Sequence, residues 1–154
     1  MSSYEDKIKE QVRSYLRPGE QILAALIARA RGATMASAGN LAGNVIGGRK
    51  IAQQRRAAEG AGLKLTSPMA LAMTDQRLLV LKISPVIGMG KGGDVKELVS
   101  DVSVADVDSI EIKRLLVGKV VTVTVRGTPV KLEVGATGDA KGMADGLARA
   151  KSPA

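Results

Sequence analysis

Hydrophobic residues recur with a helical period at the start of the chain. Tyr4, Ile8, Val12, Tyr15 and Leu16 follow one another at steps of four, four, three and one residues, which places them on one stripe of a helix. Ser2 or Ser3 can cap this helix, and Arg17-Pro18-Gly19 ends it. The pattern predicts an amphipathic helix that packs on the domain, or on a second copy of itself, rather than entering a membrane.

A period of two dominates the second half of the chain. The clearest strand is 119–126 (KVVTVTVR), and the turn Gly127-Thr128-Pro129 leads from it into 130–134, so the two runs form a hairpin with one buried face. Residues 21–30 (QILAALIARA) favour a helix by composition, but the run is short and follows a Pro-Gly turn, so we predict a strand. The other predicted strands are 69–74, 76–84, 98–104 and 108–113.

A closing helix is predicted over 139–151, where apolar residues again follow the helical period. Thr137 or Asp139 can cap it, while Gly142 and Gly146 weaken it in isolation, so it must rely on docking to the sheet. Seven short strands and a final helix predict a mainly β fold, a small curved sheet pair or barrel plugged at one end.

An insert at 32–65 separates the first strand from the second. Its first part, 33–48 (ATMASAGNLAGNVIGG), is uncharged and rich in glycine, which favours a flexible loop. The alternative is a conditional helix that becomes ordered on a partner or a membrane surface. In such a helix Gly39, Gly43 and Gly47 would form one smooth groove, a candidate surface for self-association.

Charge changes the picture of the insert. The chain carries a net charge of +8, and residues 1–65 hold eleven basic and five acidic side chains, against twelve and ten in 66–154. The stretch 29–58 contains no acidic residue, and its six basic residues are our candidates for contact with an anion or a lipid headgroup. These six residues are Arg29, Arg31, Arg49, Lys50, Arg55 and Arg56.

Several kinds of chemistry are disfavoured by the composition. The chain has no Cys and no His, so it lacks thiolate nucleophiles, imidazole bases and the usual ligands of zinc. The run GMGKGG (88–93) matches a dinucleotide-binding pattern, but Pro85 interrupts its approach and no helix pattern follows. We therefore predict no enzyme, no cofactor and no metal site. The acids Asp101, Asp106, Asp108 and Glu111 lack the order of a calcium loop and are interpreted as solvent-side residues.

Aromatic residues are almost absent, because the chain has two Tyr and neither Phe nor Trp. Tyr4 and Tyr15 share one face of the predicted first helix and are interpreted as packing anchors. No aromatic side chain lies among the basic residues to stack on bases, so specific nucleic-acid binding is not expected. The sequence shows no targeting signal and no apolar run long enough to span a bilayer, which predicts a cytoplasmic location, with the inner membrane face as a peripheral site.

The span 66–151 resembles the bacterial pleckstrin-homology-like (PH-like) domains, a YokE-like group related to GRAM domains. The matching segments are PGEQIL (18–23), MTDQRLLVLK (73–82), 101–119, VVTVTVRGTPVKLEV (120–134) and the helix 139–150. The resemblance implies a bent antiparallel barrel of seven strands capped by a C-terminal helix. It also implies a division into an N-terminal helix and turn (1–19), a PH-like domain (20–151) and a short tail (152–154).

In pleckstrin-homology domains generally, basic residues near the loop between the first two strands hold phosphoinositide headgroups. The insert 32–65 occupies this connection and carries the acid-free basic stretch. We therefore predict a non-catalytic PH-like adaptor whose insert contacts anionic phospholipid or another copy of the protein. The alternative is a protein–protein scaffold with a disordered insert and no lipid binding; non-specific nucleic-acid binding is a weaker third reading.

Overall fold

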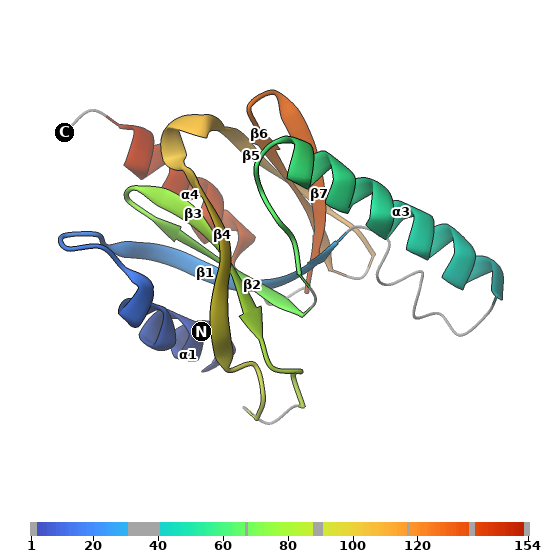
Figure 1. Ribbon diagram of the computed structural model, residues 1–154, viewed down its shortest axis with the longest axis horizontal. Helices are drawn as coiled ribbons and strands as arrows, with labels where there is room; N and C mark the ends of the chain where they lie inside the picture. Colours follow the sequence, from blue (N-terminus) through green and yellow to red (C-terminus); the bar gives the residue numbers. More distant parts are fainter. Residues whose placement is uncertain are drawn as a thin grey trace.

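The computed structural model describes residues 3–30, 41–66, 68–87, 91–116, 118–135 and 138–152, and Figure 1 shows their arrangement. The three main helices are α1 (Ser3–Val12), α3 (Leu41–Gly60) and α4 (Ala140–Lys151), with short 3₁₀ turns η1 (Arg13–Tyr15) and η2 (Val104–Asp106). The strands are β1 (Ile22–Ala30), β2 (Met69–Thr74), β3 (Arg77–Ile83), β4 (Val95–Ser103), β5 (Val107–Arg114), β6 (Lys119–Val125) and β7 (Thr128–Val134).

The strands form one antiparallel sheet of seven, in the order β4-β3-β2-β1-β7-β6-β5. The part of β1 before Ala28 pairs with β2 alone. Ala28 pairs with both β2 and β7, and Arg29 and Ala30 pair with β7. β1 thus joins a half made of β1–β4 to a half made of β5–β7. This architecture, with a helix after the last strand, is the one that the PH-like resemblance implies, so the predicted fold class is confirmed.

The inner face of the bent sheet encloses the main core. Residues from both halves of the sheet meet there, among them Leu26 from β1, Leu78 from β3 and Leu132 from β7. α4 closes this core through Met143 and Leu147, and Asp139 caps the helix by accepting a hydrogen bond from the Gly142 backbone at 2.9 Å.

The glycine at position 146 lets α4 pack closely on the sheet. A Cβ atom at Gly146 would lie 3.3 Å from Leu23 and 3.3 Å from Met73, tighter than an ordinary van der Waals contact. That the helix relies on this docking stays a prediction.

The outer face of β1–β4 is covered by α1. Ile8 and Val12 are fully buried against Ala25, Leu79 and neighbouring residues, which confirms that the first helix packs on the domain. Tyr4 and Tyr15 also bind the backbone: the Tyr4 hydroxyl donates to the Lys91 carbonyl at 3.0 Å, and the Tyr15 hydroxyl to the Lys96 carbonyl at 3.4 Å. Tyr4 therefore anchors α1, and Tyr15 anchors the following turn η1, to the β3–β4 hairpin.

The preferred interpretation of 33–48 as a loop is wrong for residues 41–48, which belong to the twenty-residue helix α3. Residues 33–40 lie outside the described residues. The helix is held at its C-terminal end, where Ala58 and the following Ala61, Leu63 and Leu65 are buried in the main core and Ile51 packs against it. This packing, together with the helix-forming residues of 49–58, outweighs the local cost of Gly43 and Gly47.

Candidate functional site

α3 carries the described part of the predicted basic surface. Figure 1 shows this helix projecting from the side of the sheet, with its N-terminal end far from the strands. Its inner side is defined by Ile51 and Ala58, which pack on the core, and by Gln54, whose side-chain oxygen accepts a hydrogen bond from the Lys131 backbone of β7 at 2.7 Å.

The arginines of α3 face water. Arg49, Arg55 and Arg56 are exposed, and Arg49 and Arg56 are seven residues apart, which places them on the side of the helix opposite Ile51. Within the part of the chain that the structure describes, none of these three arginines forms an ion pair. The acid of this helix, Glu59, is also exposed, one turn after Arg55.

The other predicted basic residues are placed differently. Arg29, near the end of β1, lies 4.0 Å from the carboxylate of Glu133 on β7, its direct neighbour across the two strands. Lys50 belongs to the α3 backbone, and Arg31 lies outside the described residues. The structure therefore groups Arg49, Arg55 and Arg56 on one helix and separates Arg29 from them.

The predicted glycine groove is described only in part. Gly43 and Gly47 lie in α3, eight and four residues before Ile51, so they are on the side of the helix that packs against the core further along. Gly39 lies outside the described residues. A role of this groove in self-association stays a prediction.

The C-terminal part of the insert packs against the sheet. Leu63 and Leu65 are buried in the main core, and Lys64 between them binds the Ser100 side chain of β4 through both its backbone groups, at 3.0 and 3.1 Å. The Arg126 guanidinium donates to the Ala61 carbonyl at 2.9 Å. Any ligand of the insert must therefore meet the outer side of α3 rather than the sheet interior beneath it.

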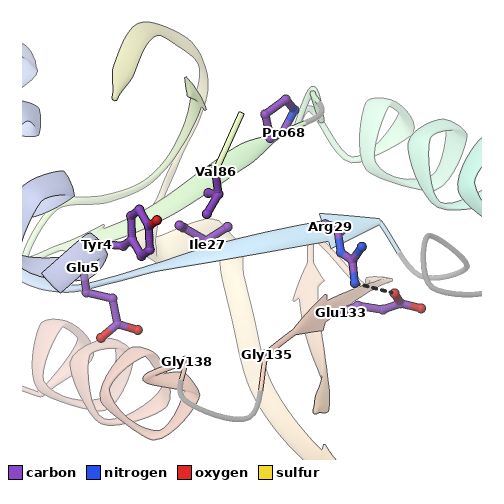
Figure 2. Close-up of a pocket in the computed structure, with 9 residues that line it drawn as sticks. All are labelled: Tyr4, Glu5, Ile27, Arg29, Pro68, Val86, Glu133, Gly135 and Gly138. Atoms are coloured by element: carbon purple, nitrogen blue, oxygen red, sulfur yellow. Dashed lines mark ion pairs between the residues drawn. The ribbon is translucent and has the colours of Figure 1, made fainter. Parts of the chain in front are cut away.

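A pocket of about 380 Å³ lies on the outer face, between the start of α1 and the ends of β1 and β7. Figure 2 shows Tyr4 and Ile27 on one side and the Arg29–Glu133 ion pair on the other. Its remaining lining residues are Glu5, Pro68, Val86, Gly135 and Gly138.

The charges of this pocket are largely satisfied within the protein. Glu133 is buried to more than nine tenths and pairs with Arg29, while Glu5 accepts a hydrogen bond from the Asp139 backbone at 2.8 Å. Burial raises the pKa of Glu5, and the nearby Asp139 carboxylate raises it further, although the hydrogen bond from the Asp139 backbone lowers it. The pocket thus links α1 to the β7–α4 connection and has an acidic rim.

Comparison with solved structures finds a likeness to a known protein. No family model and no curated protein matches the chain. The chain is similar to the crystal structure of a DUF1696 family protein with a pleckstrin-homology domain from Shewanella loihica PV-4, with a TM-score of 0.45, 13% sequence identity and coverage of 96% of each chain. The fold assignment rests on the strand order and the capping helix of this chain.

A buried ionic cluster escaped the sequence reasoning. Arg77 donates to both carboxylate oxygens of Glu20, each at 2.9 Å, and to Asp101 at 2.6 Å, while Thr74 donates to Glu20 at 2.7 Å. Glu20 and Arg77 belong to the two short motifs PGEQIL and MTDQR, 57 residues apart in sequence. The available signals were an acid beside Pro-Gly and a Thr-Asp turn before a basic residue, and the structure shows that these residues join the start of β1 to the β2–β3 turn.

The interpretation of the four acids as solvent-side residues holds for Asp108 and Glu111, which are exposed, while Asp101 and Asp106 are half-buried. Three of the four also form bonds within the protein. Asp101 binds Arg77, Asp106 pairs with Arg126 at 2.9 Å, and Asp108 accepts a hydrogen bond from the Gly127 backbone at 2.7 Å. Among the described residues, Glu111 is the one of the four acids that forms no such bond. The three bonded acids therefore help to fix turns.

Among the described residues, no cluster of three or more acidic side chains is placed to hold a metal ion. No helix in the described ranges has the length and apolar character needed to cross a membrane.

Proposed function

We propose that this chain is a non-catalytic PH-like binding module that attaches reversibly to anionic phospholipid through the outer side of α3. The observation that carries the proposal is the exposure of Arg49, Arg55 and Arg56 on a helix that projects from the domain and is fixed to β7. Arg49 and Arg56 lie on the side of the helix away from the core and can approach a layer of phosphates together, while Arg55 lies closer to the packed side.

The expected strength of this attachment is modest. A basic residue near an anionic surface contributes about 1 kcal/mol, so Arg49 and Arg56 together contribute about 2 kcal/mol, and salt weakens the effect. The chain has no Trp to anchor it at the interface. The module should therefore bind and leave a cytoplasmic membrane face readily, as a peripheral protein.

A charge-matched pair of variants tests the proposal. In the first, Arg49, Arg55 and Arg56 are replaced by Gln; in the second, three exposed basic residues of α4 are replaced by Gln, namely Lys141, Arg149 and Lys151. Both variants lose the same net charge, so a general effect of charge would weaken both alike. We expect the α3 variant alone to lose most of its sedimentation with phosphatidylglycerol vesicles at low salt; equal losses would refute a specific role for α3.

Self-association of the protein through the glycines of α3 is the rival to lipid contact at the insert. If Gly43 and Gly47 lie in a helix–helix contact, Gly43→Leu should change the mass measured by light scattering without lipid. An unchanged mass would contradict self-association through these glycines.

A further inference from the structure

We propose that the free edge of β5 pairs antiparallel with the β5 edge of a second copy, so that two chains form one dimer about a twofold axis at Ile112. β5 is the last strand in the order of the sheet, and among the described strands it pairs with β6 alone. A strand at the edge of a sheet presents unpaired backbone groups to any strand that can lie beside it. This inference goes beyond the proposed function and does not depend on it.

The last part of β5 is open to solvent on both faces of the sheet. Residues 111–114 are all exposed, although successive side chains of a strand point to opposite faces. Ile112 is more than a third exposed, as is Leu115, which follows the strand, and Leu116 at the tip of the β5–β6 hairpin is completely exposed. Three of the five large hydrophobic residues that are exposed in the described part of the chain thus lie on or beside this strand.

The opposite edge of the sheet is less open. There the Ser100 side chain of β4 accepts a hydrogen bond from the Lys64 backbone N–H at 3.0 Å and donates one to the Lys64 carbonyl at 3.1 Å. The insert therefore occupies part of the β4 edge. Among the described strands, β5 is the edge strand that remains available to a second chain.

The hydrogen bonding of the β5–β6 hairpin shows which backbone groups of β5 are free. The Leu115 N–H donates to the Gly118 carbonyl at 3.1 Å, and bonded and non-bonded residue pairs alternate along two antiparallel strands. Counting back along the register, Lys113 and Glu111 direct their backbone groups toward β6. The intervening residues direct theirs toward the free edge: Ile110, Ile112 and Arg114.

The charges on this edge favour one register of self-pairing. A pair of strands centred on Ile112 uses the three residues with free backbone groups, and it places Glu111 opposite Lys113 of the second copy, twice by symmetry. A shift by one step in either direction would place Glu111 opposite Glu111, or Lys113 opposite Lys113. Opposite charges across two strands stabilise their pairing and like charges oppose it. The edge is therefore complementary to a second copy of itself in the register centred on Ile112.

Reversal of either charge tests this register. Glu111→Lys and Lys113→Glu each turn two attractive cross-strand pairs into repulsive ones, so each should weaken dimerisation at least about tenfold in light scattering. Glu97→Lys is the matched control, because it makes the same charge change at an exposed position of the other edge strand, β4. Equal weakening by the control would show that net charge alone is responsible and would overturn the proposal.

Mixing the two reversed variants gives a sharper result. The Glu111→Lys edge is basic at both positions and the Lys113→Glu edge is acidic at both, so each opposes its own copy and complements the other. We expect a mixture to form a heterodimer, and the double variant Glu111→Lys/Lys113→Glu to form a homodimer as the wild type does. A mixture that stays monomeric would contradict the register.

A disulfide locates the twofold axis directly, because the chain has no cysteine of its own. Two Ile112→Cys residues would face each other across the axis with a Cα separation of about 5.5 Å, which a disulfide can span. Arg114→Cys is the control, since its opposite residue in this register is Ile110 of the second copy. Under mild oxidation, we expect covalent dimers of the Ile112→Cys protein alone, and equal cross-linking of both proteins would contradict an axis at Ile112.

The mass of the wild type decides whether this dimer forms at all. A contact between two strands is small, so we expect a dissociation constant between about 1 μM and 1 mM. A wild-type protein that is still monomeric at about 1 mM in light scattering would overturn the proposal. A dimer that is lost in Gly43→Leu but kept in both charge-reversed variants would show that the copies pair through α3, and would also overturn it.

Discussion

Glu20 is a buried carboxylate with partners from the distant β2–β3 turn and from the backbone of its own turn. Arg77 binds it through two nitrogens, Thr74 donates its hydroxyl, and the Arg17 backbone donates at 2.9 Å. Burial by itself raises the pKa of this carboxyl, but the hydrogen bonds outweigh that effect and lower the pKa from 4.5 to about 2. A charge that is buried and fully bonded fixes the geometry of its surroundings, because any displacement leaves it without partners.

Loss of the arginine should therefore be costly. Arg77→Met leaves the Glu20 carboxylate buried without its charged partner, and we expect the free energy of unfolding to fall by about 3–5 kcal/mol in urea denaturation. Arg13→Met is the matched control, because Arg13 and its partner Glu10 are both more than two thirds exposed and their pair should contribute less than about 1 kcal/mol. Similar losses in the two variants would contradict the role of the buried cluster.

The same cluster predicts a pH dependence of stability. Glu20 has a lower pKa in the folded state than its ordinary value of 4.5, so its contribution is fully present above about pH 4.5 and is lost as the pH falls toward 2. The lost contribution amounts to about 3 kcal/mol. Urea denaturation of wild type and Glu20→Gln at several pH values measures it: the wild type should lose more stability than the variant across this window, and parallel curves would contradict the assignment.

At the scale of elements, the sequence predicted most strands because their side chains repeat every second residue. It also placed β1 correctly against helical propensity, since this strand is bonded to β2 and β7, and tertiary pairing decides its conformation. The prediction of a loop at the start of α3 was wrong because tertiary packing again outweighs local propensity. Glycine disfavours a helix locally, whereas α3 is stabilised by burial of Ala58 and Ile51, which no local pattern reveals.

The site was predictable only in outline. The acid-free basic stretch marked the insert, and three of its arginines do share one helix. The pairing of Arg29 with Glu133 could not be read from the chain, because it depends on the register of β1 against β7. The exposed leucines of the β5–β6 tip were also invisible, since an apolar pair after a strand gives no sign of whether it is buried.

Attachment of the insert to the core makes an element-scale prediction. Leu63 is fully buried in the main core, so Leu63→Ala should lower the free energy of unfolding by about 3 kcal/mol. Leu116→Ala makes the same chemical change at a completely exposed position and should alter it by less than about 0.5 kcal/mol. Equal effects in chemical denaturation would mean that the insert does not belong to the folding core.

At the scale of the whole molecule, the two sides of the sheet have different partners. α1 covers the outer face of β1–β4, α4 closes the inner core, and α3 projects from the side with its arginines turned to solvent (Figure 1). The net charge of +8 is therefore distributed unevenly over the molecule, and we assign lipid binding to the basic residues of the insert. Binding through such a surface is electrostatic and must respond to both lipid charge and salt.

The most direct test of this account is sedimentation of the wild-type protein with vesicles at two salt concentrations. The account predicts that the protein sediments with phosphatidylglycerol vesicles at about 0.05 M salt, is released at about 1 M salt, where charges are screened within a few ångströms, and does not sediment with phosphatidylcholine vesicles. If the protein stays in the supernatant with anionic vesicles at low salt, attachment to anionic lipid is contradicted.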